Sequence, residues 1–172
     1  ISEQRAAIPM ILATGAVHTH LVKEALRTYT SINAQVGECL DTHYFAVLIG
    51  VGATTVNAYL AQETIIDRHK RGLFEGLSLY ECVQRYLEAV DQGLLKIMSK
   101  MGISIISSYR GAYKFEAVGL SRWLVYSYFP GMTSRISGIG LSGLQQKVTE
   151  IHNHAFQDDR LSLPVGGLYR YR

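Results

Sequence analysis

The sequence predicts an α/β fold of repeated strand-helix units with a mainly parallel sheet, either open or closed as part of a β/α barrel. Three observations predict this class. Apolar runs of strand length end at glycine, segments of helical spacing follow them, and the unit recurs along the chain. Because the expected strands are apolar on both faces, helices should cover both faces of the sheet. We expect residues 1–172 to be a segment of one such domain.

The first 76 residues contain three such units and a loop. We expect strands where apolar or β-branched residues run together, at residues 8–14, 31–36 and 54–60. We expect helices where apolar residues recur at helical spacing, at residues 20–26, 42–49 and 62–70. Glycines at positions 15, 37 and 50 punctuate these segments, and the polar stretch 68–76 is predicted to be an exposed loop.

The strongest helix signal covers residues 78–101. Ser78 followed by Glu81 is a capping-box pattern, which predicts a helix start. Apolar residues then recur every three or four positions, at Leu79, Val83, Leu87, Val90, Leu94, Ile97 and Met101. Gly93 lies inside this helix, so we expect a bend or a close packing contact there.

The remaining third is predicted to continue the alternation. We expect a buried strand from Ile103 to Tyr109, a short helix at residues 113–118 ended by Gly119, and a strand at residues 123–129. Ser142 and Gln145 form a second capping-box pattern. The last helix should carry the apolar stripe Leu144, Val148, Ile151 and Ala155, and residues 163–171 should be extended.

Composition narrows the classes of function. With 48% hydrophobic and 18% charged residues, much of the surface should be covered by neighbouring structure. The net charge of +3 is spread along the chain and predicts neither nucleic-acid nor membrane binding. No apolar run reaches the roughly 18 to 20 residues that span a bilayer. Lacking an initiator Met and a signal peptide, the sequence is expected to begin inside a longer protein. Cys39 and Cys82 are predicted to be packed thiols in a reducing cytoplasmic compartment.

Candidate chemistry belongs at the carboxyl ends of the expected strands, near Gly15, Gly37, Tyr109, Arg110 and Gly111. A metal site is conceivable from His18, His20, Glu38 and His43. However, a spacing of two directs the rings of His18 and His20 to different sides, which favours junction packing. His152 and His154 have the same spacing, and we expect them to be solvated.

Two further patterns bear on ligand binding. Gly138, Gly140 and Gly143 spell GxGxxG before a helix, with Asp158 and Asp159 downstream, as in a dinucleotide site. No expected strand precedes these glycines, which favours a turn that leads into a capped helix. Four cations, Lys96, Lys100, Arg110 and Arg135, are candidates for anion contacts, although single cations are mostly structural or solvated. No GxSxG nucleophile elbow is present.

Four blocks carry a family resemblance. They are IPMILATGAVHTHLVKEALRT from Ile8, THYFAVLIGVGATTVNAYLAQETI from Thr42, GLLKIMSKMGISIISSYRGAYKFEAVGL from Gly93 and GMTSRISGIGL from Gly131. The chain resembles the large subunits of glutamate synthases, NADPH- or ferredoxin-dependent, over essentially its whole length, including the closing VGGLYRYR. It is similar to the later part of their central domain, which leads to the FMN-binding domain.

The resemblance implies a role in converting glutamine and 2-oxoglutarate to glutamate. It implies that the segment itself holds no catalytic, cofactor or metal residue, whereas FMN and a 3Fe-4S cluster belong to the parent. The segment would scaffold the domains and help to wall an ammonia tunnel. Its partners would be the amidotransferase and FMN domains, and a reductase subunit or ferredoxin through the parent. Polar positions that match the family, without an assigned role, are His18, Glu38, His43, Lys100, Arg110, Ser134 and Arg135.

At three positions the chain departs from the family pattern, because Gln35, Leu40 and Tyr44 replace Glu, Arg and His. Two other interpretations stay open from the residues alone. One is an independent small α/β protein that binds a phosphorylated ligand or dinucleotide at residues 138–143. The other is an assembly adaptor unrelated to any flavoenzyme.

Overall fold

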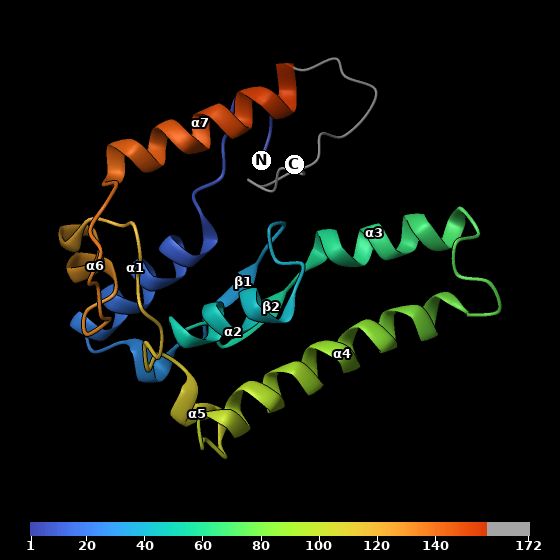
Figure 1. Cartoon of the computed structure of the whole chain (residues 1–172), viewed down its shortest axis with the longest axis horizontal. Coiled ribbons are helices and arrows are strands. Elements are labelled where there is room, and N and C mark those ends of the chain that lie inside the picture. The colour runs from blue at the N-terminus through green and yellow to red at the C-terminus, as the bar shows by residue number, and fades with distance from the viewer. Residues whose placement is uncertain (158–172) are drawn as a thin grey trace, which may run out of the picture.

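The computed structural model describes residues 1–157, and the described part is mixed helical with one small parallel sheet. Its elements, in chain order, are α1 (Met10–Lys23), the 3-10 turn η1 (Arg27–Tyr29), β1 (Asn33–Gln35), α2 (Thr42–Gly50), β2 (Thr55–Asn57), α3 (Tyr59–Lys70), α4 (Leu79–Lys100), α5 (Ile106–Tyr109), α6 (Arg122–Tyr128) and α7 (Leu141–Gln157). Helix α2 lies centrally between α1 and α4, α3 and α4 form a hairpin on the right, and α7 lies along the top (Figure 1).

The sheet is the part of the predicted fold that the structure confirms most directly. Strands β1 and β2 pair in parallel, with Asn33 opposite Thr55 and Gln35 opposite Asn57. Helix α2 connects the two strands, so this segment is a strand-helix-strand crossover. Strand β1 lies within the predicted strand 31–36, and β2 lies within the predicted strand 54–60. The predicted helices 42–49 and 62–70 correspond to α2 and α3. The predicted loop begins only after Lys70, because α3 includes residues 68–70.

Two predicted strands are wrong, because both segments are helices. Residues 8–14 lie mostly in α1, and residues 123–129 lie mostly in α6. An apolar run does not by itself distinguish a strand from a helix that is buried on one side. In α1 the buried positions are the small residues Thr14, Gly15 and Thr19, and α6 packs against this helix. Ser121 begins α6, since its Oγ accepts a hydrogen bond from the Leu124 N–H at 3.2 Å.

The segment between α4 and α6 also differs from its prediction. The expected strand at Ile103–Tyr109 contains the short helix α5, and the segment expected to be a helix at 113–118 has no regular secondary structure apart from an isolated bridge at Glu116. This segment pairs through single parallel bridges, Glu116 with Thr133 and Leu120 with Ile139. Within residues 1–157 the two named strands have three residues each, so the expected multi-stranded sheet is wrong there and the barrel-like alternative is not confirmed. The expected extended segment 163–171 lies outside the described residues.

The long helix α4 confirms its prediction in detail. The Ser78 N–H donates to Glu81 Oε2 at 2.8 Å, and the Glu81 N–H donates to Ser78 Oγ at 3.3 Å, which completes the capping box. Gly93 is the expected close contact, since a Cβ at this position would lie 2.5 Å from Cγ2 of Thr42. Glycine therefore allows α4 to pack tightly against the start of α2.

Helix α7 begins at Leu141, one residue before the predicted cap Ser142. Part of its expected apolar stripe is used within the chain, because Leu144 packs against a buried cluster. Ile151 is 70% exposed. In residues 1–157 no helix is both long enough and apolar enough to cross a membrane.

Helix α2 organises the buried core. Phe45 and Leu48 belong to one apolar cluster with the sheet and α4, Ala46 belongs to a second with Met98 and Tyr109, and Val47 packs against a third around Leu124. A helix that is apolar on every side is buried on every side. The three clusters therefore meet around α2, and the loops that follow its carboxyl end are held close together.

Candidate functional site

Residues from three loops meet at His18 of α1, and we call His18, Arg27, Gly52, Arg110 and Gly111 the His18 junction. The Arg27 Nε–H donates to Nδ1 of His18 at 3.0 Å, so Nδ1 is the unprotonated nitrogen of the ring. Burial lowers the pKa of His18, and the nearby charge of Arg27 lowers it further. His18 is therefore neutral at physiological pH and acts as a hydrogen-bond acceptor.

Arg27 fastens α1 to the sheet. Its Nη1 donates to the Thr30 carbonyl oxygen at 2.6 Å, and its Nη2 donates to the Gly52 carbonyl oxygen at 2.9 Å and to Thr54 Oγ1 at 3.3 Å. Burial and the charge of Arg110 lower the pKa of its guanidinium group, which stays protonated at neutral pH. The acceptors are neutral, so the positive charge of Arg27 is hydrogen-bonded but not neutralised by them.

Two glycines enclose the His18 ring. Gly52 has φ +123°, and a Cβ there would lie 2.5 Å from Cγ of His18. Gly111 has φ +67°, and its Cβ would lie 2.9 Å from Cε1 on the ring. Both positions therefore require glycine for conformation and for space. The Gly111 N–H donates to the Ile49 carbonyl oxygen at 3.1 Å, which ties this loop to the end of α2.

Arg110 enters the junction beside Gly111. Its Nε is buried and has no hydrogen-bond partner. Burying a charged donor without a partner costs free energy, so this atom is the unusual feature of the junction. The structure thus brings together two of the family-matching residues, His18 and Arg110. Arg27 was missed as a site residue, although it lies within the block that begins at Ile8.

The other family-matching residues lie elsewhere. At the amino-terminal end of α2, the Tyr44 hydroxyl donates to Oε2 of Glu38, and the His43 ring stands edge-on to Phe115 with centroids 6.2 Å apart. The rise of α2 separates His43 from Gly50 by about 10 Å along the helix. His18, Glu38 and His43 therefore do not share a metal site, and residues 1–157 contain no cluster of three potential metal ligands.

Ser134 and Arg135 belong to a third neighbourhood, near the start of α6. Arg122 donates to the carbonyl oxygens of Ser134 at 3.5 Å and Arg135 at 3.1 Å. The Arg135 Nε lies 3.6 Å from Oε1 of Glu116, an exposed ion pair. Ser134 Oγ is buried without a partner. Lys100 is exposed at the last turn of α4, so these predicted positions do not form one site with the His18 junction.

The GxGxxG segment is explained by packing. A Cβ on Gly138 would lie 2.5 Å from the carbonyl carbon of Gly119, so glycine permits two backbones to approach. A single bridge at Ile139, rather than a strand, precedes α7, so the context of a dinucleotide fingerprint is missing from residues 133–157. Asp158 and Asp159, the predicted ribose acids, lie outside the described residues.

The two cysteines and His152 are held by packing or hydrogen bonds within the chain. Cys39 and Cys82 are buried free thiols, as predicted, and burial with the charge of Asp41 raises the pKa of Cys39 to about 12.

The prediction that His152 is solvated is wrong. One of its ring nitrogens lies 2.8 Å from the Glu3 carbonyl oxygen, and the ring packs on Phe156 at a centroid distance of 4.8 Å. His152 therefore holds α7 to the amino-terminal segment.

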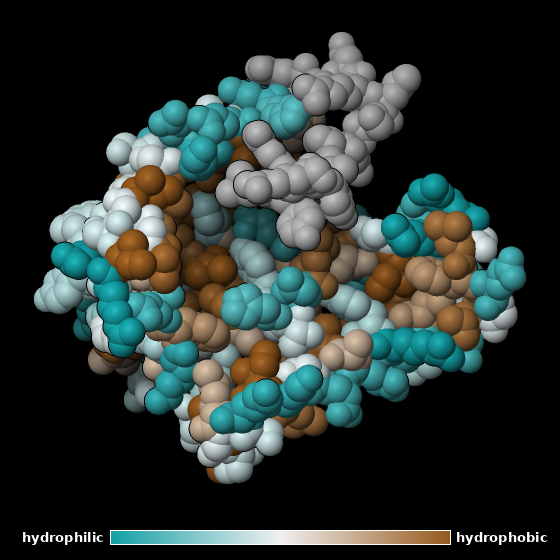
Figure 2. Space-filling model, viewed as in Figure 1, coloured by the Kyte–Doolittle hydropathy of each residue, from teal (hydrophilic) through white to brown (hydrophobic). Residues whose placement is uncertain are grey.

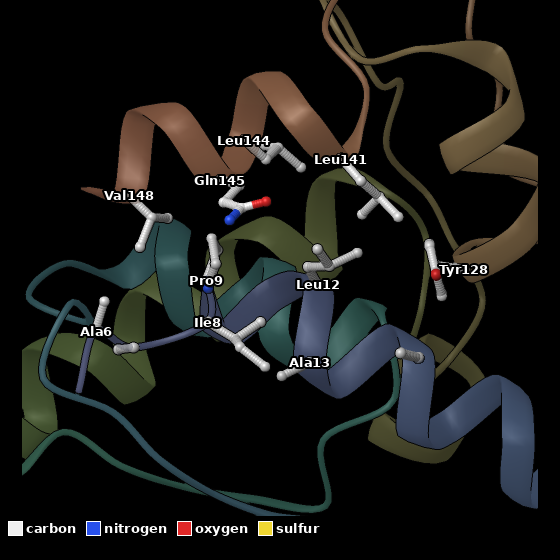
Figure 3. Close-up of a pocket in the computed structure, with 12 residues that line it drawn as sticks. Ala6, Ile8, Pro9, Leu12, Ala13, Tyr128, Leu141, Leu144, Gln145 and Val148 are labelled. Atoms are coloured by element: carbon white, nitrogen blue, oxygen red, sulfur yellow. The ribbon is translucent and has the colours of Figure 1, made fainter. Parts of the chain in front are cut away.

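A cavity of about 430 Å³ separates α1 from α7. Figure 3 shows Leu141, Leu144 and Val148 of α7 pointing toward Ile8 and Leu12 across this space. Gln145 and Tyr128 supply its polar side chains. Among residues 1–157, no acid or base that titrates near neutral pH lines this cavity, so these walls are suited to apolar contact rather than to acid–base chemistry.

Together these features define a mixed α/β segment in which a central crossover helix holds three loops around a half-buried histidine. The chain belongs to the glutamate synthase central domain family, whose model matches residues 1–121. The His18 junction lies wholly within the matched residues, whereas α6 and α7 lie beyond them.

Curated relatives extend this match over the whole chain. The chain is 66% identical to the NADPH glutamate synthase large chain of Azospirillum brasilense over 168 residues, covering 98% of this chain and 11% of that protein. It is 43% identical to the NADPH glutamate synthase large chain of Bacillus subtilis, covering 100% of this chain and 11% of that protein. It is 38% identical to ferredoxin-dependent glutamate synthase 2 of Synechocystis, covering 100% and 12%. The chain thus spans about a tenth of the length of these relatives, and the predicted family resemblance is confirmed.

Proposed function

We propose that residues 1–172 are a segment of one α/β domain in a glutamate synthase large chain. The observation that carries this proposal is the 66% identity over 98% of the chain to the large chain from Azospirillum brasilense. In the proposed parent, glutamine and 2-oxoglutarate are converted to glutamate. Relatives are named for NADPH or for ferredoxin, so the parent would receive electrons from a reductase subunit or from ferredoxin.

The proposed role of the segment is to hold neighbouring domains in place and to help wall the ammonia path between them. Its core around α2 is rigidly packed, which suits a spacer between two active sites. Its surface near α6 stays apolar, since Trp123 is 62% and Tyr126 is 81% exposed. Apolar atoms are also visible around the left of the molecule in Figure 2, over the α1 and α6 region. Such a surface is typical of a face that another domain covers.

Catalysis in this proposal belongs to other parts of the parent. In this proposal FMN and the 3Fe-4S cluster are bound outside this segment, as the family resemblance implies. We propose a cytoplasmic location for the parent, with reduced thiols at Cys39 and Cys82. Relatives from spinach and rice are named as chloroplastic, so the compartment depends on the host.

The experiment uses the full-length large chain with charged residues placed on the α6 surface, Trp123→Glu and Tyr126→Glu. Because both side chains are exposed in this segment, the variants should fold but lose contact with the adjoining domain. We expect ammonia to escape into solution while glutamine is hydrolysed, and glutamate formation to fall severalfold. Synthesis with added ammonium should be retained.

The matched control is Tyr80→Glu, another exposed aromatic residue, on α4. It should leave the ratio of glutamate formed to glutamine hydrolysed unchanged. If both α6 variants keep that ratio at the wild-type value, the proposed role of this surface in coupling the two reactions is wrong.

A further inference from the structure

The His18 junction contains two positive charges that no carboxylate of the described residues neutralises. Arg27 donates its hydrogen bonds to a histidine nitrogen, two carbonyl oxygens and a hydroxyl. In residues 1–157 the ion pairs join Arg71 to Asp67, Arg135 to Glu116 and Lys147 to Glu150. Within these residues, therefore, neither Arg27 nor Arg110 forms an ion pair with an acid.

Arg110 has a hydrogen-bond donor that no other group of the described residues accepts. Its Nε–H is buried and has no partner, although a guanidinium group has five N–H donors in a fixed fork. The backbone beside it is already held, because Gly111 packs on the His18 ring and a hydrogen bond from Arg27 orients that ring. A donor that is positioned in advance in this way loses little entropy when it binds a ligand.

The backbone of this loop distinguishes between classes of anion. The N–H groups of residues 110–113 are all occupied, by the carbonyl oxygens of Ile106, Ile49, Tyr109 and Gly50 respectively. Phosphate sites commonly use several free backbone N–H groups, and this loop offers none from those four residues. The edge of the Arg110 guanidinium group instead matches the two oxygens of a carboxylate.

We propose that Arg110 binds a carboxylate, with the charge of Arg27 beside it adding to the attraction. The carboxylate has two sources, a free dicarboxylate or an acidic side chain of a neighbouring domain in the longer protein. Binding would neutralise one of the two charges. The proposal does not depend on the scaffold role or on an ammonia path, and only its second source uses the proposed parent.

The first experiment measures thermal unfolding of the 172-residue chain in sodium succinate or sodium glutarate against sodium chloride at equal ionic strength. If the source is a free dicarboxylate, wild type should gain several degrees in Tm with saturation. Arg110→Gln should abolish the gain, and Arg110→Lys should weaken apparent affinity at least tenfold, because lysine keeps the charge but not the fork. Arg135→Gln, which removes an exposed and already paired arginine, should keep the full response.

The second experiment compares the same variants in the full-length large chain. If the source is a side chain of a neighbouring domain, Arg110→Gln should lower Tm more in the full-length protein than in the 172-residue chain. Arg135→Gln should not show this difference. The carboxylate site is refuted if neither experiment shows its expected response, or if sodium phosphate stabilises the chain more than succinate and glutarate do. Neither result bears on ammonia transfer, so this inference and the proposed function fail separately.

Discussion

Helices α2 and α7 both carry apolar side chains, but the chain buries these side chains to very different degrees. Around α2, Phe45, Ala46 and Leu48 are buried in two different clusters, and glycines allow neighbouring elements to approach. Between positions 141 and 156 of α7, by contrast, no residue is fully buried. Figure 1 shows α2 surrounded by other elements and α7 standing at the edge.

This contrast shows that an apolar stripe indicates which face of a helix should be buried, but not which other part of the protein buries it. The stripe of α7 was readable from the sequence, yet Leu144 and Val148 face a cavity and Ile151 is 70% exposed. We infer that stability resides mainly around α2, and that α7 contributes little until something else covers it. The following predictions test this difference, from the largest expected effect to the smallest.

The largest effect is expected at the glycine that encloses His18. Gly52→Ala would place a Cβ against the imidazole ring at φ +123°, combining backbone strain with overpacking. We expect a loss of about 4 kcal/mol in the free energy of unfolding, measured by urea denaturation. Gly72→Ala is the control, because Gly72 has φ +72° but nothing within 4 Å, and it should cost about 1 kcal/mol. Equal losses would mean that the junction is not tightly packed.

The next effect compares the two helices directly. Leu48→Ala removes a side chain of α2 that is 0% exposed, so it should cost about 3 kcal/mol through lost burial and a new cavity. Ile151→Ala on α7 should cost less than about 0.5 kcal/mol, since the side chain is mostly in solvent. Chemical denaturation of both variants gives the two values. A loss at Ile151 as large as that at Leu48 would contradict the difference between the helices.

A pH dependence is expected from His18. Its pKa is lower in the folded chain than its ordinary value of about 6.5, chiefly because it is buried, so the unfolded chain binds the proton more tightly. This contribution to stability should be full above about pH 6.5 and fall as the pH decreases toward the lower folded pKa. Denaturation between pH 7.5 and pH 5 measures it. His18→Gln should flatten this part of the profile, and the exposed neighbour His20→Gln should leave it unchanged.

The smallest effect is expected at the start of α4, far along the chain from the junction. Ser78→Ala removes the cap that accepts from the Glu81 N–H and should cost about 1 kcal/mol. Ser78→Asn should restore most of this loss, because asparagine is also a good N-cap. Denaturation of the three proteins provides the comparison. No loss in the alanine variant would show that tertiary contacts alone determine where α4 begins.

The sequence predicted those elements whose signals are local. The capping box of α4, the glycine that ends α2 and the β-branched residues of β2 are each readable within a few positions, and all three elements were predicted. The strands predicted at 8–14 and 123–129 failed because their apolar runs fit either a strand or a packed helix. Which structure forms depends on the contacts between α1 and α6, and these contacts join residues more than 100 positions apart.

For the His18 junction, too, the sequence indicated some of the residues and only the tertiary structure revealed the others. The blocks of sequence were enough to identify the family and to mark His18 and Arg110 as matching positions. They did not indicate that Arg27 hydrogen-bonds to His18, or that Gly52 and Gly111 enclose its ring. Family membership can be recognised from the residue identities along the chain alone. The unpaired charge of Arg110 is a product of tertiary packing, because only folding buries its Nε and directs the backbone donors of residues 110–113 to other partners.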